Sequence, residues 1–137
     1  MIRAPRARRL REMSGGEEPT AGIISSGVLL SIILEEIHMT PEGKVKHKIK
    51  LVLDSYGAYY HMPVLNGMGK PSLDFVCCYR GRFFAIEAKG AGQSMTLRQE
   101  ATQAEMEKAG ATVFKVSNKE EMMVVVNWIE GIKNERD

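Results

Sequence analysis

The chain has 137 residues, of which 19 are Lys or Arg and 17 are Asp or Glu, giving a net charge of +2 at pH 7. This length predicts one compact domain, and the hydrophobic fraction of 44% excludes a chain that is disordered throughout. So small a net charge neither favours nor excludes a polyanionic partner, and any case for nucleic acid must therefore come from a site.

The segment before Met39 has a composition unlike the rest of the chain. Arginines crowd its start, a linker-like stretch spans 14–19, and an apolar run spans 23–34. A basic start and a short apolar run resemble a secretory signal, and Arg8-Arg9 resembles a twin-arginine signal, but Glu35-Glu36 stands where a small-residue cleavage site would be. The run is shorter than the about 20 residues that cross a bilayer, so no membrane span is expected.

Two further interpretations of this segment stay open. Met39 is the natural start if the codons of Glu35-Glu36 form a purine-rich ribosome-binding site, and the residues before it are then not native. Alternatively, the arginines form a basic arm that contacts the DNA backbone. We expect residues 1–38 to be an extension that is disordered or not native, and residues 39–137 to form the one domain.

The first helix after this segment is predicted to begin at Thr40 and to end at Gly57. Thr40 suits the N-cap, Pro41 the first helical position, and Gly57 the C-terminal end of the helix. Apolar residues recur between them at helical spacing. A short strand is predicted over 58–64, followed by a loop rich in glycine over 66–72.

Two apolar strands are predicted over 73–79 and 82–89, joined by a tight turn at Arg80-Gly81. A helix over 96–109 then begins with a Thr96-x-x-Gln99 capping box. A strand and a last helix complete the order αβββαβα, which predicts an α/β fold with a mixed central sheet flanked by helices. The strand spans 111–116, the helix begins with Ser117-x-x-Glu120, and its apolar side carries Met122, Met123, Val126 and Ile129.

The two cysteines, Cys77 and Cys78, are adjacent in the first strand of this hairpin. Neighbouring side chains of a strand point to opposite faces, so the two thiols are not expected to form a disulfide. The chain has no other cysteine to pair with. We therefore expect a reducing compartment, the cytoplasm.

The tight turn predicts which residues of the hairpin oppose each other. If the turn has two residues, Asp74 stands directly opposite Glu87, and Lys89 lies on the same face. Two opposed carboxylates repel each other, so we expect either a divalent cation between them or a proton held by one of them. Oxygen ligands of this kind suit Mg²⁺ or Mn²⁺, which can activate a water and stabilise charge at a phosphorus centre.

The alternative is an exposed ion pair of Asp74, Glu87 and Lys89, which would contribute only about 0–1 kcal/mol to stability. However, the strand residues between the two acids and the turn are mostly apolar, as in strands that are buried on both faces. Charged residues at the end of such strands favour a functional site.

This series of residues resembles the signature of the PD-(D/E)XK nuclease superfamily, in which an Asp is followed at a distance by Glu-x-Lys. Here Asp74 is followed, after twelve residues, by Glu87-Ala88-Lys89. The longer series is similar to the VRR-NUC branch of that superfamily, and the resemblance covers roughly residues 41–127. It adds Gly69, the turn over 79–84, Thr96-Leu97-Arg98-Gln99 and Gly110, with Leu73 as a departure because the family usually has proline there.

The resemblance implies a restriction-endonuclease-like fold and a set of site residues. The implied metal ligands are Asp74, Glu87, the backbone carbonyl of Ala88 and the first-helix carboxylate of Glu42; Lys89 would be the catalytic lysine and Gln99 would lie close to the metal. For Glu42 a simple role as partner of the helix dipole stays open, as does the capping box for Gln99. Lys70, Lys44 and Lys48 are expected to contact DNA phosphates, although lysines around the first helix could also form a solvated surface.

By the same resemblance we expect a Mg²⁺- or Mn²⁺-dependent endonuclease that hydrolyses DNA phosphodiester bonds with an activated water as nucleophile. Small members of the branch resemble Holliday-junction resolvases, so a homodimer and structure-selective cutting of branched DNA are expected, in a bacterial or phage-infected cell. Two alternatives remain open. One is a nucleic-acid-binding module of the same fold without cleavage, and the other is a sequence-specific nuclease of the restriction type.

Overall fold

The computed structural model describes residues 25–64 and 67–135, and the chain divides into two compact units, Met1–Ile37 and His38–Asp137. Helix α2 spans Ser26–His38, within the segment for which the sequence predicted an extension that is disordered or not native. These residues are helical, and whether they are native stays a prediction. The arginine-rich start of the chain lies outside the described residues. None of the helices in the described ranges has both the length and the apolar character that crossing a membrane requires.

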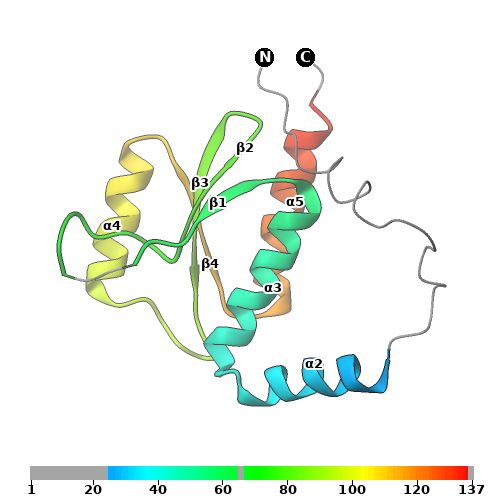
Figure 1. The fold of residues 1–137 in the computed structure, drawn as a ribbon. Helices are drawn as coiled ribbons and strands as arrows, with labels where there is room; N and C mark the ends of the chain where they lie inside the picture. Colours follow the sequence, from blue (N-terminus) through cyan, green and yellow to red (C-terminus); the bar gives the residue numbers. More distant parts are fainter. Residues whose placement is uncertain (1–24, 65–66, 136–137) are drawn as a thin grey trace. The chain divides into compact units, whose positions relative to one another are not determined.

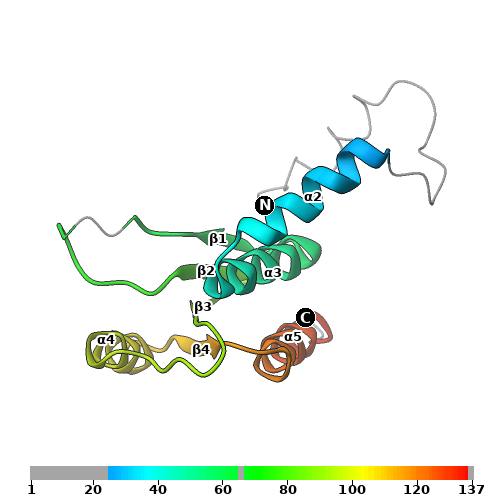
Figure 2. The ribbon, with the colours of Figure 1, turned by 90° about the horizontal axis from the view of Figure 1, so that it is seen from below.

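The second unit is a mixed four-stranded sheet with helices on both faces, as the sequence predicted. The sheet order is β1-β2-β3-β4, in which β1 to β3 run antiparallel and β4 lies parallel to β3. Helix α4 covers one face, and helices α3 and α5 cover the other (Figures 1 and 2). The elements are α3 (Pro41–Tyr56), β1 (Tyr59–His61), β2 (Phe75–Tyr79), β3 (Arg82–Ala88), α4 (Leu97–Lys108), β4 (Thr112–Val116) and α5 (Lys119–Lys133).

Helix α3 begins and ends at the residues that the sequence indicated. The Thr40 hydroxyl accepts a hydrogen bond from the N–H of Gly43, and Gly57 adopts φ +70°, a left-handed conformation that glycine tolerates best. The strands are shorter than predicted: β1 covers only Tyr59–His61 of the expected 58–64. The first residues after β1 therefore lead into the glycine-rich loop that borders the site described below.

The register of the β2–β3 hairpin is the predicted one. Tyr79 pairs with Arg82 and Phe75 with Ile86, so the turn consists of two residues. Arg80 has φ +46° and Gly81 has φ +80°, as a two-residue turn of type I′ requires. Continuing the register by one residue brings Asp74 opposite Glu87.

The main apolar core lies between the sheet and the two helices α3 and α5. Phe75, Phe84 and Ile86 of the sheet are fully buried, and they pack against side chains from α3 and α5. Trp128 of α5 adds aromatic contacts, with its ring centroid 5.0 Å from that of Phe84. The helix residues of this core include Ile49, Leu53, Val125, Ile129 and Ile132. The sequence pattern indicates no role for Trp128.

The opposite face of the sheet, under α4, carries polar side chains. Thr102 is the buried residue of α4, and Glu87 and Lys89 are the buried charged residues of the described part of the chain. The strand β2 is buried on one face only, since Cys77 is buried and its neighbour Cys78 is exposed. Both thiols are free, as the sequence predicted.

The start of α5 differs from the predicted one by one residue. Asn118, and not Ser117, is the N-cap, and its side chain accepts a hydrogen bond of 2.8 Å from the N–H of Glu121. The Ser117 hydroxyl donates instead to the Glu121 carboxylate. The prediction of the apolar side of α5 is also partly wrong, because Met123 is exposed and Val125 is buried.

Candidate active site

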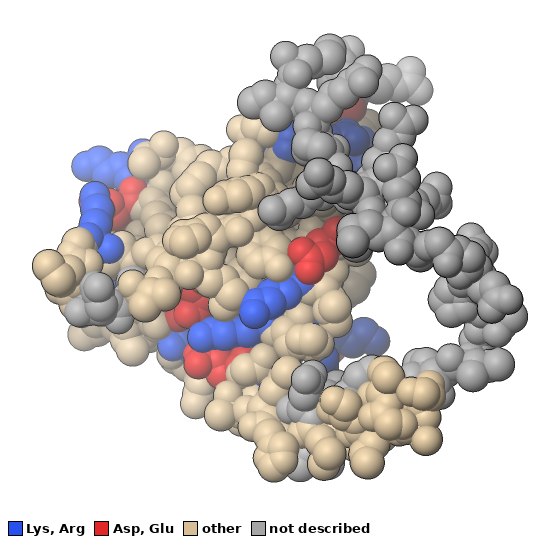
Figure 3. All heavy atoms as spheres, in the orientation of Figure 1, with Lys and Arg blue, Asp and Glu red and all other residues tan. Residues whose placement is uncertain are grey.

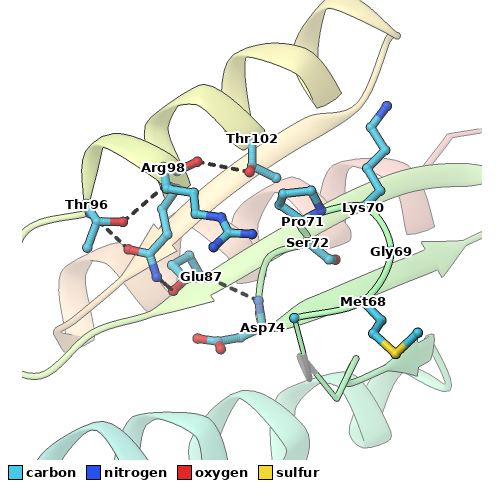
Figure 4. Close-up of a pocket in the computed structure, with 12 residues that line it drawn as sticks. Met68, Gly69, Lys70, Pro71, Ser72, Asp74, Glu87, Thr96, Arg98 and Thr102 are labelled. Atoms are coloured by element: carbon cyan, nitrogen blue, oxygen red, sulfur yellow. Dashed lines mark hydrogen bonds between the residues drawn. The ribbon is translucent and has the colours of Figure 1, made fainter.

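The carboxylates of Asp74 and Glu87 each accept a backbone hydrogen bond from the opposite side of the hairpin. The backbone N–H of Asp74 donates to Glu87 Oε2 at 3.0 Å, and the backbone N–H of Ala88 donates to Asp74 Oδ2 at 3.0 Å. Asp74 directly precedes β2 and Glu87 lies near the end of β3, so the hairpin register itself brings the two carboxyl groups together (Figure 4). The predicted juxtaposition of the two acids is confirmed.

Gln99 and Lys89 both approach the Glu87 carboxylate. Gln99 Nε2 donates to Glu87 Oε1 at 2.5 Å, and Lys89 Nζ lies 3.8 Å from the same oxygen. The orientation of Gln99 is fixed by the predicted capping box: its Oε1 accepts from the N–H of Thr96, and the Thr96 hydroxyl accepts from the N–H of Gln99. One glutamine therefore both caps α4 and anchors Glu87.

The surroundings of Glu87 disfavour its negative charge. The residue is only 2% exposed, and burial raises the pKa of its carboxyl group to about 7, with repulsion from Asp74 as the second cause. The N–H of Asp74 and the ammonium of Lys89 oppose this rise in pKa but do not cancel it. A buried acid beside a second acid is stabilised by a proton or by an added cation, which is the behaviour expected of a metal ligand.

Lys46 of α3 is a site residue that the sequence analysis missed. Its Nζ lies 3.5 Å from Asp74 Oδ1 and 3.9 Å from Glu42 Oε2. Glu42 is thereby held near the pair of acids through Lys46, and its charge contributes weakly to the raised pKa of Glu87. The signal in the sequence was the spacing of four residues between Glu42 and Lys46, which places both on one side of the helix.

A cavity of about 260 Å³ opens beside the two acids, between α4 and the glycine-rich loop. Arg98 extends from the first turn of α4 across this cavity toward Ser72 and Asp74 (Figure 4). Lys70 also lines the cavity, with its ammonium paired to Glu105 of α4. Lys70, which the sequence predicted as a phosphate contact, thus lies at the site. Arg98 is a second cation in the cavity lining, and the sequence had indicated no role for it.

Lys44 and Lys48 are not brought to the acids. In a helix, a residue two positions further along is rotated by about 200°, so both lysines lie on the far side of α3 from Glu42 and Lys46. Lys48 lines a different cavity, near the start of α5. On the face of the molecule that Figure 3 shows, basic and acidic side chains are interspersed and form no broad basic patch.

The carboxylate oxygens of Asp74 and Glu87 are the kind of ligand that suits a hard divalent cation bound by few protein groups. Within the described ranges, no three Asp, Glu, His or Cys side chains gather closely enough to hold a metal ion, so Glu42 does not form a triad with Asp74 and Glu87. Two carboxylates are nevertheless a usual protein contribution to Mg²⁺, which keeps several waters and binds substrate phosphates. Ala88, the third expected ligand, lies beside the two acids, since its backbone N–H donates a hydrogen bond to Asp74 Oδ2.

Comparisons of the chain with models of protein families, with curated proteins and with solved structures found no match. The VRR-NUC resemblance therefore stays a prediction from the residues named above.

Proposed function

We propose that this chain is a divalent-metal-dependent endonuclease that hydrolyses phosphodiester bonds in DNA. The observation that carries the proposal is the pair of Asp74 and Glu87, joined through each other's backbone N–H groups. Lys89 and Gln99 contact the buried member of this pair. The group borders a cavity lined by two basic residues, so acids, an ammonium and phosphate-binding cations meet at one place.

Mg²⁺ or Mn²⁺ held by Asp74 and Glu87, with the backbone carbonyl of Ala88 as the expected further ligand, would lower the pKa of a water and stabilise charge on the phosphate. The two carboxylates fit this role because Glu87 is buried, repelled by its neighbour and short of positive charge. Gln99 fixes the rotamer of Glu87 by its hydrogen bond to Oε1, and the capping box in turn fixes Gln99.

Lys89 supplies a positive charge at the buried end of the site. Its side chain is only 11% exposed, so its ammonium acts in a region that is poor in water. Here it can orient the attacking water or neutralise charge that develops on the phosphoryl oxygens. Arg98 and Lys70 stand on the cavity side, where they would bind phosphates next to the scissile one.

We further propose branched DNA as the preferred substrate and a homodimer as the working form, in the cytoplasm of a bacterial or phage-infected cell. A dimer with two-fold symmetry presents two equal sites, which suits the near-symmetric arms of a four-way junction. Lys44 and Lys48 play no part in this proposal because they face away from the acids.

The proposal is tested with labelled linear, flapped and four-way DNA incubated with Mg²⁺, Mn²⁺ or a chelator. The wild-type chain should cut only with metal, and Asp74→Asn and Glu87→Gln should each reduce the rate at least about 100-fold, as expected for a loss of about 3 kcal/mol of transition-state stabilisation. Both variants should still bind DNA in a gel-shift assay.

The matched control is Glu120→Gln, which removes one exposed carboxylate at the start of α5 and should leave the rate unchanged. If the wild-type chain binds DNA but cuts none of the three substrates with either metal, the protein is a binding module instead. Discrete fragments of fixed length from plasmid DNA would indicate sequence-specific cutting.

A further inference from the structure

Lys46 bridges two carboxylates that belong to different parts of the fold. Glu42 lies one turn earlier on the same helix, whereas Asp74 comes from the segment that leads into β2. The ammonium stands within 4 Å of both, at 3.9 Å from Glu42 Oε2 and 3.5 Å from Asp74 Oδ1. One positive charge thus occupies the space between the two acids on the α3 side of the site.

The position of this ammonium is set by the core. Ile49 and Leu53, on the same side of α3, are buried at 1% and 0% exposure, so the helix cannot rotate about its axis without losing core contacts. Lys46 and Asp74 have side chains that are 31% and 21% exposed, so the pair is partly withdrawn from water. An ion pair in such a position is screened less than an exposed one.

We propose that Lys46 takes the place of a second metal ion between Glu42 and Asp74, so that the site binds one divalent cation, on the Asp74–Glu87 side. This inference rests on the proposed metal-dependent function. It assigns to Lys46 a positioning role: it holds Asp74 toward α3 and reserves the other carboxylate oxygen for the side where Glu87 lies. Lys89 and Gln99 hold Glu87 in position through its Oε1.

The reason is electrostatic. Glu42 and Asp74 would together offer a cation two oxygen ligands, but the ammonium already lies between them and offsets one of their two negative charges, so a divalent ion beside it would meet repulsion from a fixed positive charge. On the other side, the Lys89 ammonium approaches Glu87 at 3.8 Å, but within the described residues no ammonium is paired with both Asp74 and Glu87 in the way that Lys46 is paired with both Glu42 and Asp74.

The test is a titration with Mn²⁺, followed by isothermal calorimetry and by electron paramagnetic resonance of the bound ion. The wild-type chain should bind one Mn²⁺ with the spectrum of an isolated ion. Lys46→Met keeps the length of the stem and removes the charge, so it should bind a second Mn²⁺ and show broadening from two neighbouring ions. Lys46→Gln should behave in the same way, which guards against a folding defect of one variant.

Lys44→Met is the matched control, because it removes the same charge from the far side of the same helix; it should keep a stoichiometry of one. Two Mn²⁺ ions on the wild-type chain would overturn the inference and leave the proposed function intact, as would a single ion on both Lys46 variants. No Mn²⁺ binding by the wild-type chain at all would overturn the inference and the proposed function together.

Discussion

The two faces of the sheet differ in what they bury. The face under α3 and α5 buries large apolar side chains, such as Phe75, Phe84 and Ile86, with no exposed surface left on them. The face under α4 buries Glu87 and Lys89, both charged, together with the hydroxyl residue Thr102. Both faces are formed by the same strands, and in β3 the buried Glu87 directly follows the buried Ile86 of the apolar face.

This difference separates stability from chemistry. Apolar burial stabilises the fold by about 25 cal/mol per Å² removed from water, whereas burial of a charge costs free energy unless partners compensate it. The α4 face therefore destabilises the chain in return for a reactive site, and the α3/α5 face offsets that cost. Substitution of a buried apolar residue on the α3/α5 face should accordingly lower the stability of the fold, whereas removal of a buried charge on the α4 face should raise it.

The largest effect on stability is expected on the apolar face. Phe84→Ala should lower the free energy of unfolding by about 3–5 kcal/mol, the usual cost of removing a buried aromatic ring. Phe83→Ala, one residue earlier and 47% exposed, should change it by less than about 1 kcal/mol. Urea denaturation of the two variants measures both values, and similar losses would contradict the assignment of the faces.

An opposite effect is expected at Glu87 in metal-free buffer. Its carboxyl has a pKa of about 7 in the folded chain against 4.5 for a free side chain. The folded state therefore binds more protons between these two values, so the wild-type chain should lose stability as the pH rises from 4.5 to above 7. Glu87→Gln lacks this loss and should melt a few degrees higher than wild type at pH 8, since about 1 kcal/mol corresponds to about 4–8 °C.

Differential scanning calorimetry with a chelator measures this difference, which should vanish near pH 4. Addition of Mn²⁺ at pH 8 should raise the melting temperature of the wild type and not that of Glu87→Gln, because a ligand that binds only the folded state stabilises it. A wild-type melting curve that is the same at pH 5 and pH 8 without metal would show that Glu87 is fully compensated.

The smallest effect compares the two helix caps. Thr96→Ala and Asn118→Ala should each cost about 1 kcal/mol, the usual value for a lost N-cap. Only Thr96→Ala should also slow DNA cleavage. It removes the hydroxyl that accepts from the Gln99 N–H and so loosens the capping box, in which the backbone N–H of Thr96 orients the Gln99 side chain that holds Glu87. Thermal melting and cleavage rates of the two variants separate these effects; equal rates would mean that Gln99 keeps its position without the cap.

Local signals predicted most of this fold. The caps at Thr40 and Gly57 and the capping box at Thr96 depend on neighbouring residues only, so the sequence contains all the information that they need. The same holds for the opposition of Asp74 and Glu87, which follows from the length of one turn. At Ser117 and Asn118 two residues could each cap α5, and the sequence alone favoured the wrong one.

Contacts between distant segments were harder to predict. The sequence predicts only that lysines surround a solvated first helix, because nothing local to Lys46 shows that Asp74 lies next to it. No local pattern in the sequence indicates a role for Trp128, although the fold packs its ring against Phe84 and Phe114. Met123 was expected to be buried because it is apolar, but the rotation of α5 is set by Val125, Ile129 and Ile132.

The two-residue turn of the hairpin sets the strand register, and thereby the position of Glu87 relative to Asp74 at the other end of the hairpin. One residue inserted at Arg80-Gly81 would slide β3 by one position and turn Glu87 toward the apolar face. The identity of most residues between the turn and the acids can change without that consequence. The number of residues that separates Asp74 from Glu87 is thus a stricter requirement on this chain than the nature of any single residue within the interval.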